Sequence, residues 1–198
     1  MPEALFEWLF RGMPRTTVPR RHVVFQQGDL VPYVFGVCRG SVEIYILNAN
    51  GRKKTLTIHG PGSMFGEVFA FGDMMAFNTA EAGQESTLAL CPTHEFVKRC
   101  EQNKDLLQEC LRLLARKVRL MASQVALLAL TPSSDRVAWV LSAARALRGD
   151  SGRTLSLTQQ QLGDLAGCSR VQVARVYRSL RNHGARFAAT GAANVKEL

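Results

Sequence analysis

Arginines and short polar side chains recur at helical spacing between residues 157 and 183. At about 100° per residue, Val171, Arg175 and Arg178 fall on one face of a helix. The opposite face carries an apolar stripe made of Val173, Val176, Tyr177 and Leu180. An arginine can donate two hydrogen bonds to the two acceptor atoms that guanine presents in the major groove of DNA. The pattern therefore predicts a helix that packs by one face and could read bases with the other.

The residues just before this helix indicate how it is held. Thr158 and Gln161 have the spacing of a capping box, which opens a short helix whose apolar side chains Leu162, Leu165 and Ala166 point inward. Gly167 then suits a tight turn, and Ser169 suits the cap of the second helix. Two short helices joined by such a turn predict a helix-turn-helix.

The alternative is an ordinary helical hairpin with a solvated basic face. Charge favours the nucleic-acid interpretation, because residues 131–198 hold ten Lys/Arg against four Asp/Glu, whereas residues 1–130 hold fifteen against twelve. A positive field suits a polyanion, although a membrane surface would also attract it. Since caps, turn, stripe and charge agree, we predict binding to double-stranded DNA.

The sequence lacks the motifs of common enzymes, metal sites and membrane spans. We find no Ser/His/Asp pattern, phosphate loop or HExxH motif, so the sequence does not predict an enzyme. No CxxC pair is present, and we expect reduced, buried thiols and no metal site at Cys38, Cys91, Cys100, Cys110 and Cys168. No apolar run is long enough for a membrane span and the start does not resemble a signal peptide, so we expect a cytoplasmic protein.

From about residue 18 to 97 the chain shows short strand-like runs separated by turns. The predicted strands are His22–Gln26, Tyr33–Cys38, Ser41–Leu47, Lys54–His59 and Ser86–Cys91. Their regular spacing predicts an antiparallel β-barrel or jelly roll. Between Val68 and Gly83 no clear period is present, which leaves a short helix, a loop or both open.

After Thr93 the pattern becomes helical, with apolar residues at alternating steps of four and three. This predicted seam consists of Leu107, Leu111, Leu114, Val118, Met121, Val125 and Leu128. Such a seam could pack on the chain's own barrel or form a parallel two-stranded coiled coil. We favour the coiled coil, and with it a homodimer, because the seam is narrow and regular.

Pro132 cannot continue this helix, and we predict that Asp135 caps the next one, from Arg136 to Arg148. The expected organisation is a sensor barrel at residues 1–103, a dimerisation helix at 104–131 and a DNA-binding domain at 132–198. The expected fold class is therefore α+β.

At these residues the sequence resembles the Crp/Fnr superfamily of bacterial transcription regulators. The resemblance lies in Gly28-Asp29, the Phe35–Leu47 strand pair around Gly40, Gly60-Pro61-Gly62 before Phe65-Gly66-Glu67, and Gly167-Cys168-Ser169-Arg170 with Val173 and Arg175. It implies a cyclic-nucleotide-binding-like barrel, a long dimer helix and a winged helix-turn-helix. It also implies transcription regulation by a homodimer that binds a two-fold-symmetric operator and works with RNA polymerase.

The resemblance also implies the contacts to DNA. We expect base contacts from Arg170, Val171, Gln172 and Arg175, and phosphate contacts from Thr158, Gln160, Ser169 and Arg178. Many members of the family carry Glu where this chain has Val171, so its operator should differ from the commonest family site. The tail after His183 is poor in β-branched residues, which predicts a short or irregular wing.

Phe65-Gly66-Glu67 matches the start of the family's phosphate-binding cassette, in which the Glu grips a ribose hydroxyl. Between Lys54 and Lys98 this chain has no Lys or Arg, so the cation that would neutralise a cyclic phosphate is missing. We therefore expect that cyclic AMP and cyclic GMP are not effectors. No cysteine precedes Cys38, so an iron–sulfur cluster is not expected either.

The candidate effector pocket consists of Phe65, Gly66, Glu67, Phe77, Asn78 and Met121. Phe65, Phe69, Phe71 and Phe77 could line an apolar pocket for a small-molecule effector, or could simply be barrel core. A regulator that needs no ligand, or that responds to thiol oxidation, is the alternative function.

Overall fold

The computed structural model describes residues 1–141 and 158–182, with side chains of the last helix as far as Ser179. The chain forms two compact units, Met1–Leu120 and Met121–Leu198. The two units meet inside one long helix, at neither of the predicted domain boundaries, 103/104 and 131/132. The predicted division into three parts therefore stays a prediction.

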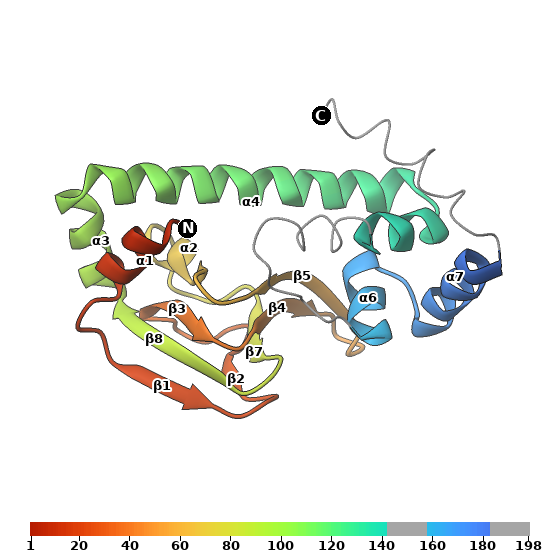
Figure 1. Ribbon diagram of the computed structural model, residues 1–198, viewed down its shortest axis with the longest axis horizontal. Helices are drawn as coiled ribbons and strands as arrows, with labels where there is room; N and C mark the ends of the chain where they lie inside the picture. The colour runs from red at the N-terminus through yellow and green to blue at the C-terminus, as the bar shows by residue number, and fades with distance from the viewer. Residues whose placement is uncertain (142–157, 183–198) are drawn as a thin grey trace. The chain divides into compact units, whose positions relative to one another are not determined.

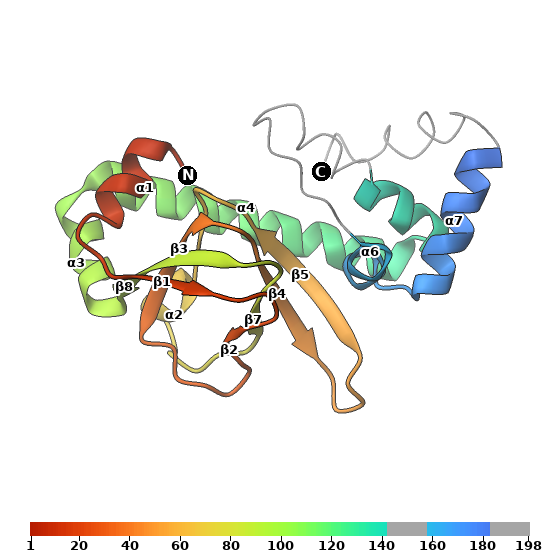
Figure 2. The same ribbon diagram turned by 60° about the horizontal axis from the view of Figure 1, so that its bottom comes forward.

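The first unit is built on two antiparallel sheets of four strands each among the described residues (Figures 1 and 2). One sheet has the strand order β1-β8-β3-β6, and the other has the order β2-β7-β4-β5. The strands are β1 (Arg15–Val18), β2 (Val23–Phe25), β3 (Tyr33–Arg39), β4 (Val42–Leu47), β5 (Lys53–His59), β6 (Met64–Phe65), β7 (Thr79–Ala82) and β8 (Ser86–Pro92). The five predicted strands are thus confirmed to within one or two residues, and β1, β6 and β7 were not predicted.

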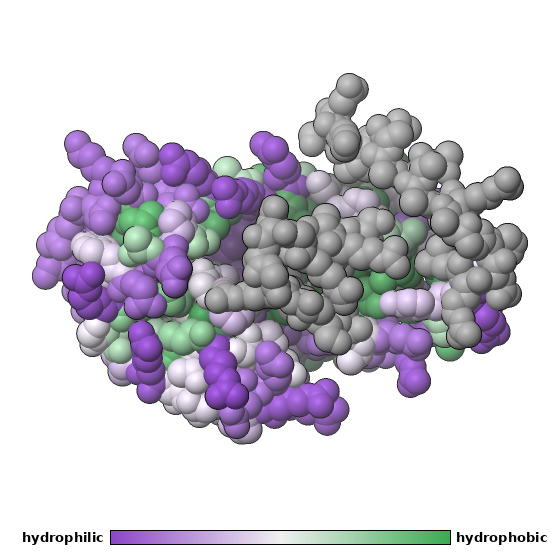
Figure 3. All heavy atoms as spheres, in the orientation of Figure 1, coloured by the Kyte–Doolittle hydropathy of each residue, from purple (hydrophilic) through white to green (hydrophobic). Residues whose placement is uncertain are grey.

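Aromatic side chains fill the space between the two sheets. The rings of Phe35 and Phe65 stack with centroids 5.0 Å apart, and the ring of Phe25 meets that of Phe69 edge-on at 5.6 Å. Smaller residues such as Ala80 complete this core. In the view of Figure 3, hydrophilic side chains cover most of the rim of this unit, with smaller hydrophobic areas between them.

Helices flank the sheets of the first unit: α1 (Glu3–Leu9), α2 (Glu67–Ala70), α3 (Thr93–Gln102) and the start of α4 (Lys104–Leu130). A second core joins α1, α3 and α4, and contains Phe10, Phe96 and Leu106. The stretch between Val68 and Gly83 contains the end of α2, a loop and β7, so both a helix and a loop occur there.

The second unit contains the end of α4, a helical stretch from residue 133 to 141, α6 (Gln159–Ala166) and α7 (Arg170–Asn182). The predicted cap at Asp135 is wrong. The carbonyl of Pro132 accepts hydrogen bonds from the N–H groups of Asp135 and Arg136, which places Asp135 within the first turn. Proline suits the position before the first turn because no partner is needed for a backbone N–H there.

Some predictions fall on residues outside the described ranges. These are the predicted helix beyond residue 141 and the wing after His183. Among the helices at residues 1–141 and 158–182, none combines the length and apolar character needed to cross a bilayer. Over the same residues, no cluster of three or more His, Cys, Asp or Glu side chains could hold a metal ion.

Candidate nucleic-acid interface and sensor site

The first helix of the predicted helix-turn-helix, α6, begins with the expected capping box. The hydroxyl of Thr158 accepts a hydrogen bond from the N–H of Gln161 at 3.2 Å, and the Gln161 side chain accepts one from the N–H of Thr158 at 2.9 Å. Two donors that lack helical partners are thereby satisfied. The first helix is thus fixed in its start and direction by two residues.

The turn after α6 depends on glycine at two positions. Gly167 has a φ of +64°, a left-handed conformation that side chains disfavour. Gly163, inside α6, lies so near the turn that a Cβ there would come within 2.8 Å of the carbonyl oxygen of Cys168. The backbone of the turn therefore packs directly on the backbone of α6, which confirms the predicted role of Gly167.

A second capping box opens α7. The N–H of Ser169 donates to Gln172 Oε1 at 2.8 Å, and the N–H of Gln172 donates to Ser169 Oγ at 3.3 Å. Gln172 Nε2 also donates to Ser133 Oγ at 3.2 Å. Both ends of the Gln172 amide are therefore bonded within this unit, and a contact from Gln172 to a base would require these bonds to exchange.

Arg136 was not predicted as part of the site, yet its side chain bonds to the backbone of the turn between α6 and α7. Its guanidinium donates to the carbonyls of Thr131 and Ala166, each at 2.8 Å, and to that of Gly167 at 3.2 Å. The last carbonyls of α6 have no partner within their own helix, so a cation is well placed there. Arg136 thus ties the helix that follows α4 to the turn between α6 and α7.

The two faces of α7 separate as predicted over the described side chains. Val173 is completely buried, with Val176 and Tyr177 packed beside it. On the other face Arg175 and Arg178 are exposed and Val171 is 68% exposed, and Arg170, which flanks this face at the start of α7, is exposed as well. In the described part of the chain, these three arginines make no hydrogen bond or ion pair. Their guanidinium groups are therefore available to a ligand.

Three of the predicted phosphate contacts lie at the starts of α6 and α7, in solvent. Thr158, Gln160 and Ser169 are exposed, and Gln160 Nε2 donates to Asp164 Oδ1 at 2.9 Å. These side chains therefore shape the two helix starts before any DNA is bound. Whether they also contact phosphates stays a prediction.

Arg136→Met is expected to destabilise the second unit by about 2–4 kcal/mol, because three hydrogen bonds from a charged group are lost and methionine preserves most of the bulk. Denaturant unfolding followed by Trp139 fluorescence in a Trp8→Phe background measures this change. Arg178→Met is the matched control and should cost less than about 0.5 kcal/mol, since Arg178 is exposed. Equal stability of the two variants would show that the Arg136 bonds do not hold the turn.

The predicted seam on α4 is largely uncovered. Val118 is 69% exposed and Leu111 is 59% exposed in the first unit, and Val125 is 66% exposed in the second. The side of α4 that packs within the first unit is a different one, formed by Leu106, Glu109 and Cys110. The remaining seam residues, Leu107, Leu114, Met121 and Leu128, are half-buried or exposed. Within the first unit, α4 therefore does not pack on the barrel through the exposed seam residues Leu107, Leu111 and Val118.

One of the predicted effector-pocket residues is a buried carboxylate. Glu67, at the start of α2, is completely buried, and its Oε1 accepts a hydrogen bond from Lys117 Nζ at 2.5 Å. Among the described residues, its Oε2 has no hydrogen-bond partner. Burial, together with the positive charge of Lys117, lowers the pKa of nearby His59 to about 3. His59 is therefore neutral at physiological pH, and Lys117 supplies the charge that balances Glu67.

The other predicted pocket residues differ in burial and in surroundings, and the pocket they would form stays a prediction. Phe65 and Phe69 belong to the barrel core, whereas Phe77 is 58% exposed. Gly66 adopts a left-handed φ of +88° just before α2. Asn78 is buried with no partner for its Oδ1, and Met121 belongs to the second unit. Phe65 and Phe69 thus pack as core residues, and contact of either with an effector stays a prediction.

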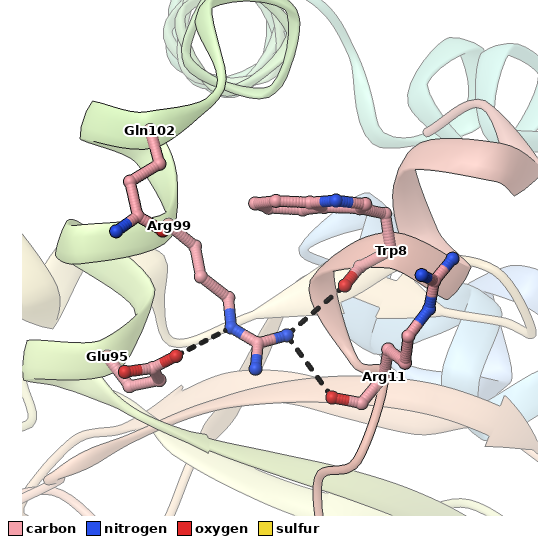
Figure 4. Close-up of a pocket in the computed structure, with 5 residues that line it drawn as sticks. All are labelled: Trp8, Arg11, Glu95, Arg99 and Gln102. Carbon is pink, nitrogen blue, oxygen red and sulfur yellow. Dashed lines mark hydrogen bonds and ion pairs between the residues drawn. The ribbon is translucent and has the colours of Figure 1, made fainter.

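A surface hollow of about 230 Å³ lies elsewhere on the first unit, lined by Trp8, Arg11, Glu95, Arg99 and Gln102 (Figure 4). Arg99 donates to Glu95 at 2.8 Å and to the carbonyls of Trp8 and Arg11 at 3.1 and 3.3 Å. Figure 4 shows the guanidinium between α3 and the end of α1. The polar groups here tie two helices together, and none of the predicted effector residues lines the hollow.

Two known protein-family domains match this chain, one after the other along the sequence. Residues 15–103 match the cyclic nucleotide-binding domain, and residues 135–186 match the Crp-like helix-turn-helix domain. The chain belongs to the Crp/Fnr family of transcription regulators. The predicted family and the α+β fold class are confirmed, and the function is that of a transcription regulator with a helix-turn-helix DNA-binding domain.

Similar proteins of the Crp/Fnr family match over most of their length. The cyclic AMP receptor protein of Thermus thermophilus is 27% identical over 92% of this chain and 84% of its own length. A CRP-like cAMP-activated global transcriptional regulator of Mycobacterium tuberculosis is 28% identical over 84% and 76%. The solved structure of FixK2 from Bradyrhizobium japonicum shares the fold, with a TM-score of 0.76, 21% identity and coverage of 87% and 86%. These relatives are transcription regulators and not enzymes.

Proposed function

We propose that this Crp/Fnr-family regulator binds a two-fold-symmetric operator as a homodimer, with α7 of each subunit in the major groove. The observation that carries the proposal is the exposed side of α7, where Arg175 and Arg178, with Arg170 at the helix start, have no partner in the described part of the chain. Helix α7 is capped by Ser169, and Arg136 holds the turn that precedes it. A rigid helix with free arginines is suited to guanine contacts.

The uncovered seam of α4 supports the homodimer. Apolar side chains at a and d positions are stable in water only when a second helix covers them. Since the helix packs within the first unit by Leu106 and Cys110, the seam is left for a second copy. Two identical subunits on one axis would bind two half-sites about one helical turn apart. Contact with RNA polymerase, and a cytoplasmic location, belong to this proposal.

The test is selection of bound duplexes from a random DNA library. The proposal predicts an enriched inverted repeat whose half-site centres are separated by about 10–11 base pairs or a multiple of it. Enrichment of a single unrepeated half-site would contradict the homodimer. No enrichment above random DNA would contradict sequence-specific binding.

We further propose that neither cyclic AMP nor cyclic GMP is the effector. The one cation that reaches Glu67 in the described residues is Lys117, and it is already paired with that carboxylate. A cyclic nucleotide would need both Glu67 for its ribose and a cation for its phosphate, so the ion pair would have to break. Phe77, which is exposed between α2 and β7, carries no charge that could replace Lys117. An uncharged or weakly charged small molecule fits these residues better.

Titration calorimetry with either nucleotide at up to about 1 mM should therefore give no binding heat. The selected operator DNA serves as the positive control for the same preparation. Binding at micromolar concentration, coupled to a change in operator affinity, would contradict the proposal. In that case Lys117→Met should abolish the nucleotide binding, which would identify Lys117 as the phosphate ligand.

A further inference from the structure

Two buried thiols face each other where the chain passes from α3 to α4. Cys100 is on α3 and Cys110 is on α4, and their Sγ atoms are 3.9 Å apart. Their side chains are only 2% and 1% exposed. Between them, Asn103 interrupts the helical backbone with an extended conformation. The two sulfur atoms are thus held in contact across a break between helices.

The pair is chemically asymmetric. The hydrogen bond between the two thiols lowers the pKa of Cys100 and, together with burial, raises the pKa of Cys110. Cys91, in the same core, differs from both: its Sγ lies 3.7 Å from the carbonyl of Pro92, and burial raises its pKa to about 11. Because the thiolate is the reactive form, Cys100 is the better nucleophile of the pair.

We propose that Cys100 and Cys110 form an intramolecular disulfide when a small hydroperoxide oxidises them, which makes the junction between α3 and α4 a redox modification site. The site lies on the side of α4 that packs within the first unit, next to the first residues of the seam. It gives a chemical basis to control by thiol oxidation, and any effect on DNA binding rests on the proposed function above.

The reaction balances with hydrogen peroxide as the oxidant. The Cys100 thiolate attacks one peroxide oxygen, the O–O bond breaks, and the departing hydroxide takes up a proton to become water, leaving a sulfenic acid on Cys100. The Cys110 sulfur then loses its proton and attacks the Cys100 sulfur, and the S–O bond breaks to release a second water. Two thiols are oxidised to one disulfide while one peroxide is reduced to two waters.

Disulfide formation would move the start of α4. The sulfur atoms must approach from 3.9 Å to a bond of about 2.05 Å. Asn103 caps α4 through its side chain, which accepts from the N–H of Leu106 at 3.1 Å, and through its carbonyl, which accepts from the N–H of Leu107 at 3.0 Å. Leu107 and Leu111 flank Cys110 on the helix, so the movement reaches the first positions of the seam.

The test treats the full-length reduced protein with hydrogen peroxide, blocks the remaining thiols in denaturant, and analyses tryptic peptides without reduction. Cleavage after Arg99, Lys104 and Arg112 places Cys100 and Cys110 on separate peptides, so only a disulfide can join them. We expect the joined pair, lighter by two hydrogen atoms than the sum of the peptides, and its return to single peptides after reduction.

Cys100→Ala and Cys110→Ala should each abolish the joined pair, whereas the matched core variant Cys91→Ala should retain it. A disulfide that includes Cys91 or joins two chains, or sulfinic acid on Cys100 without a joined pair, would overturn the proposal. Sedimentation of the oxidised and reduced protein tests the consequence separately. A joined pair with unchanged self-association would overturn the link to the seam while leaving the modification site intact.

Discussion

Val118→Glu is expected to separate the homodimer and to lower affinity for a two-half-site operator by at least about a hundredfold, because linking two half-sites contributes about 10²–10⁴ in avidity. Val118 lies at the centre of the seam and is 69% exposed in the single chain. A carboxylate there meets its own symmetry-related copy across the two-fold axis, where burial of like charges is costly. Sedimentation equilibrium and operator titration measure the two effects.

The matched control is Arg119→Glu, which adds a carboxylate at the next residue, exposed and off the seam. It should leave the dimer intact and should weaken DNA binding only slightly. Since Val118 has few contacts in its own chain, the Val118→Glu monomer should keep its thermal transition. A variant that stays dimeric would mean that the seam is not the interface.

Arg175→Ala should abolish most of the discrimination between the selected operator and random DNA. A bidentate arginine–guanine contact contributes about 1–3 kcal/mol, and a dimer loses one such contact in each half-site. Arg175 is at the centre of the exposed face of α7 and has no partner in the described residues, so the fold should not change. Competition binding against random DNA gives the selectivity directly.

Arg178→Ala separates base reading from phosphate contact. As a proposed phosphate ligand, Arg178 should contribute equally to operator and random DNA, so its loss should leave selectivity unchanged and should reduce the salt dependence of binding. If Arg175→Ala behaves like Arg178→Ala, then Arg175 is a phosphate contact and the assignment of the two roles is wrong.

Local signals predicted the helix-turn-helix well. The capping box at Thr158, the turn at Gly167 and the buried stripe on α7 each depend on residues within a few positions of one another. The second capping box has the same pattern, Ser169 followed three residues later by Gln172, and could have been recognised in the same way. Assigning Gln172 to a base contact overlooked this local use of its amide.

Contacts between residues far apart in the sequence could not be predicted from local patterns. Arg136 lies 30 residues from Ala166, and Lys117 lies 50 from Glu67, so no periodicity relates either pair. The missed strand β6 has only two residues and cannot show alternation. The long helix α4 was predictable because a heptad repeat accumulates over many turns, whereas the dimer contact along its seam stays a prediction.

Protection of guanine N7 from methylation on the selected operator tests the central claim most directly, because N7 is the major-groove atom that an arginine on α7 would bond. We predict protected guanines in both half-sites, about one helical turn apart, with the wild-type protein. Arg175→Ala should lose one protected guanine from each half-site. Tight binding without any guanine protection in the major groove would contradict the account.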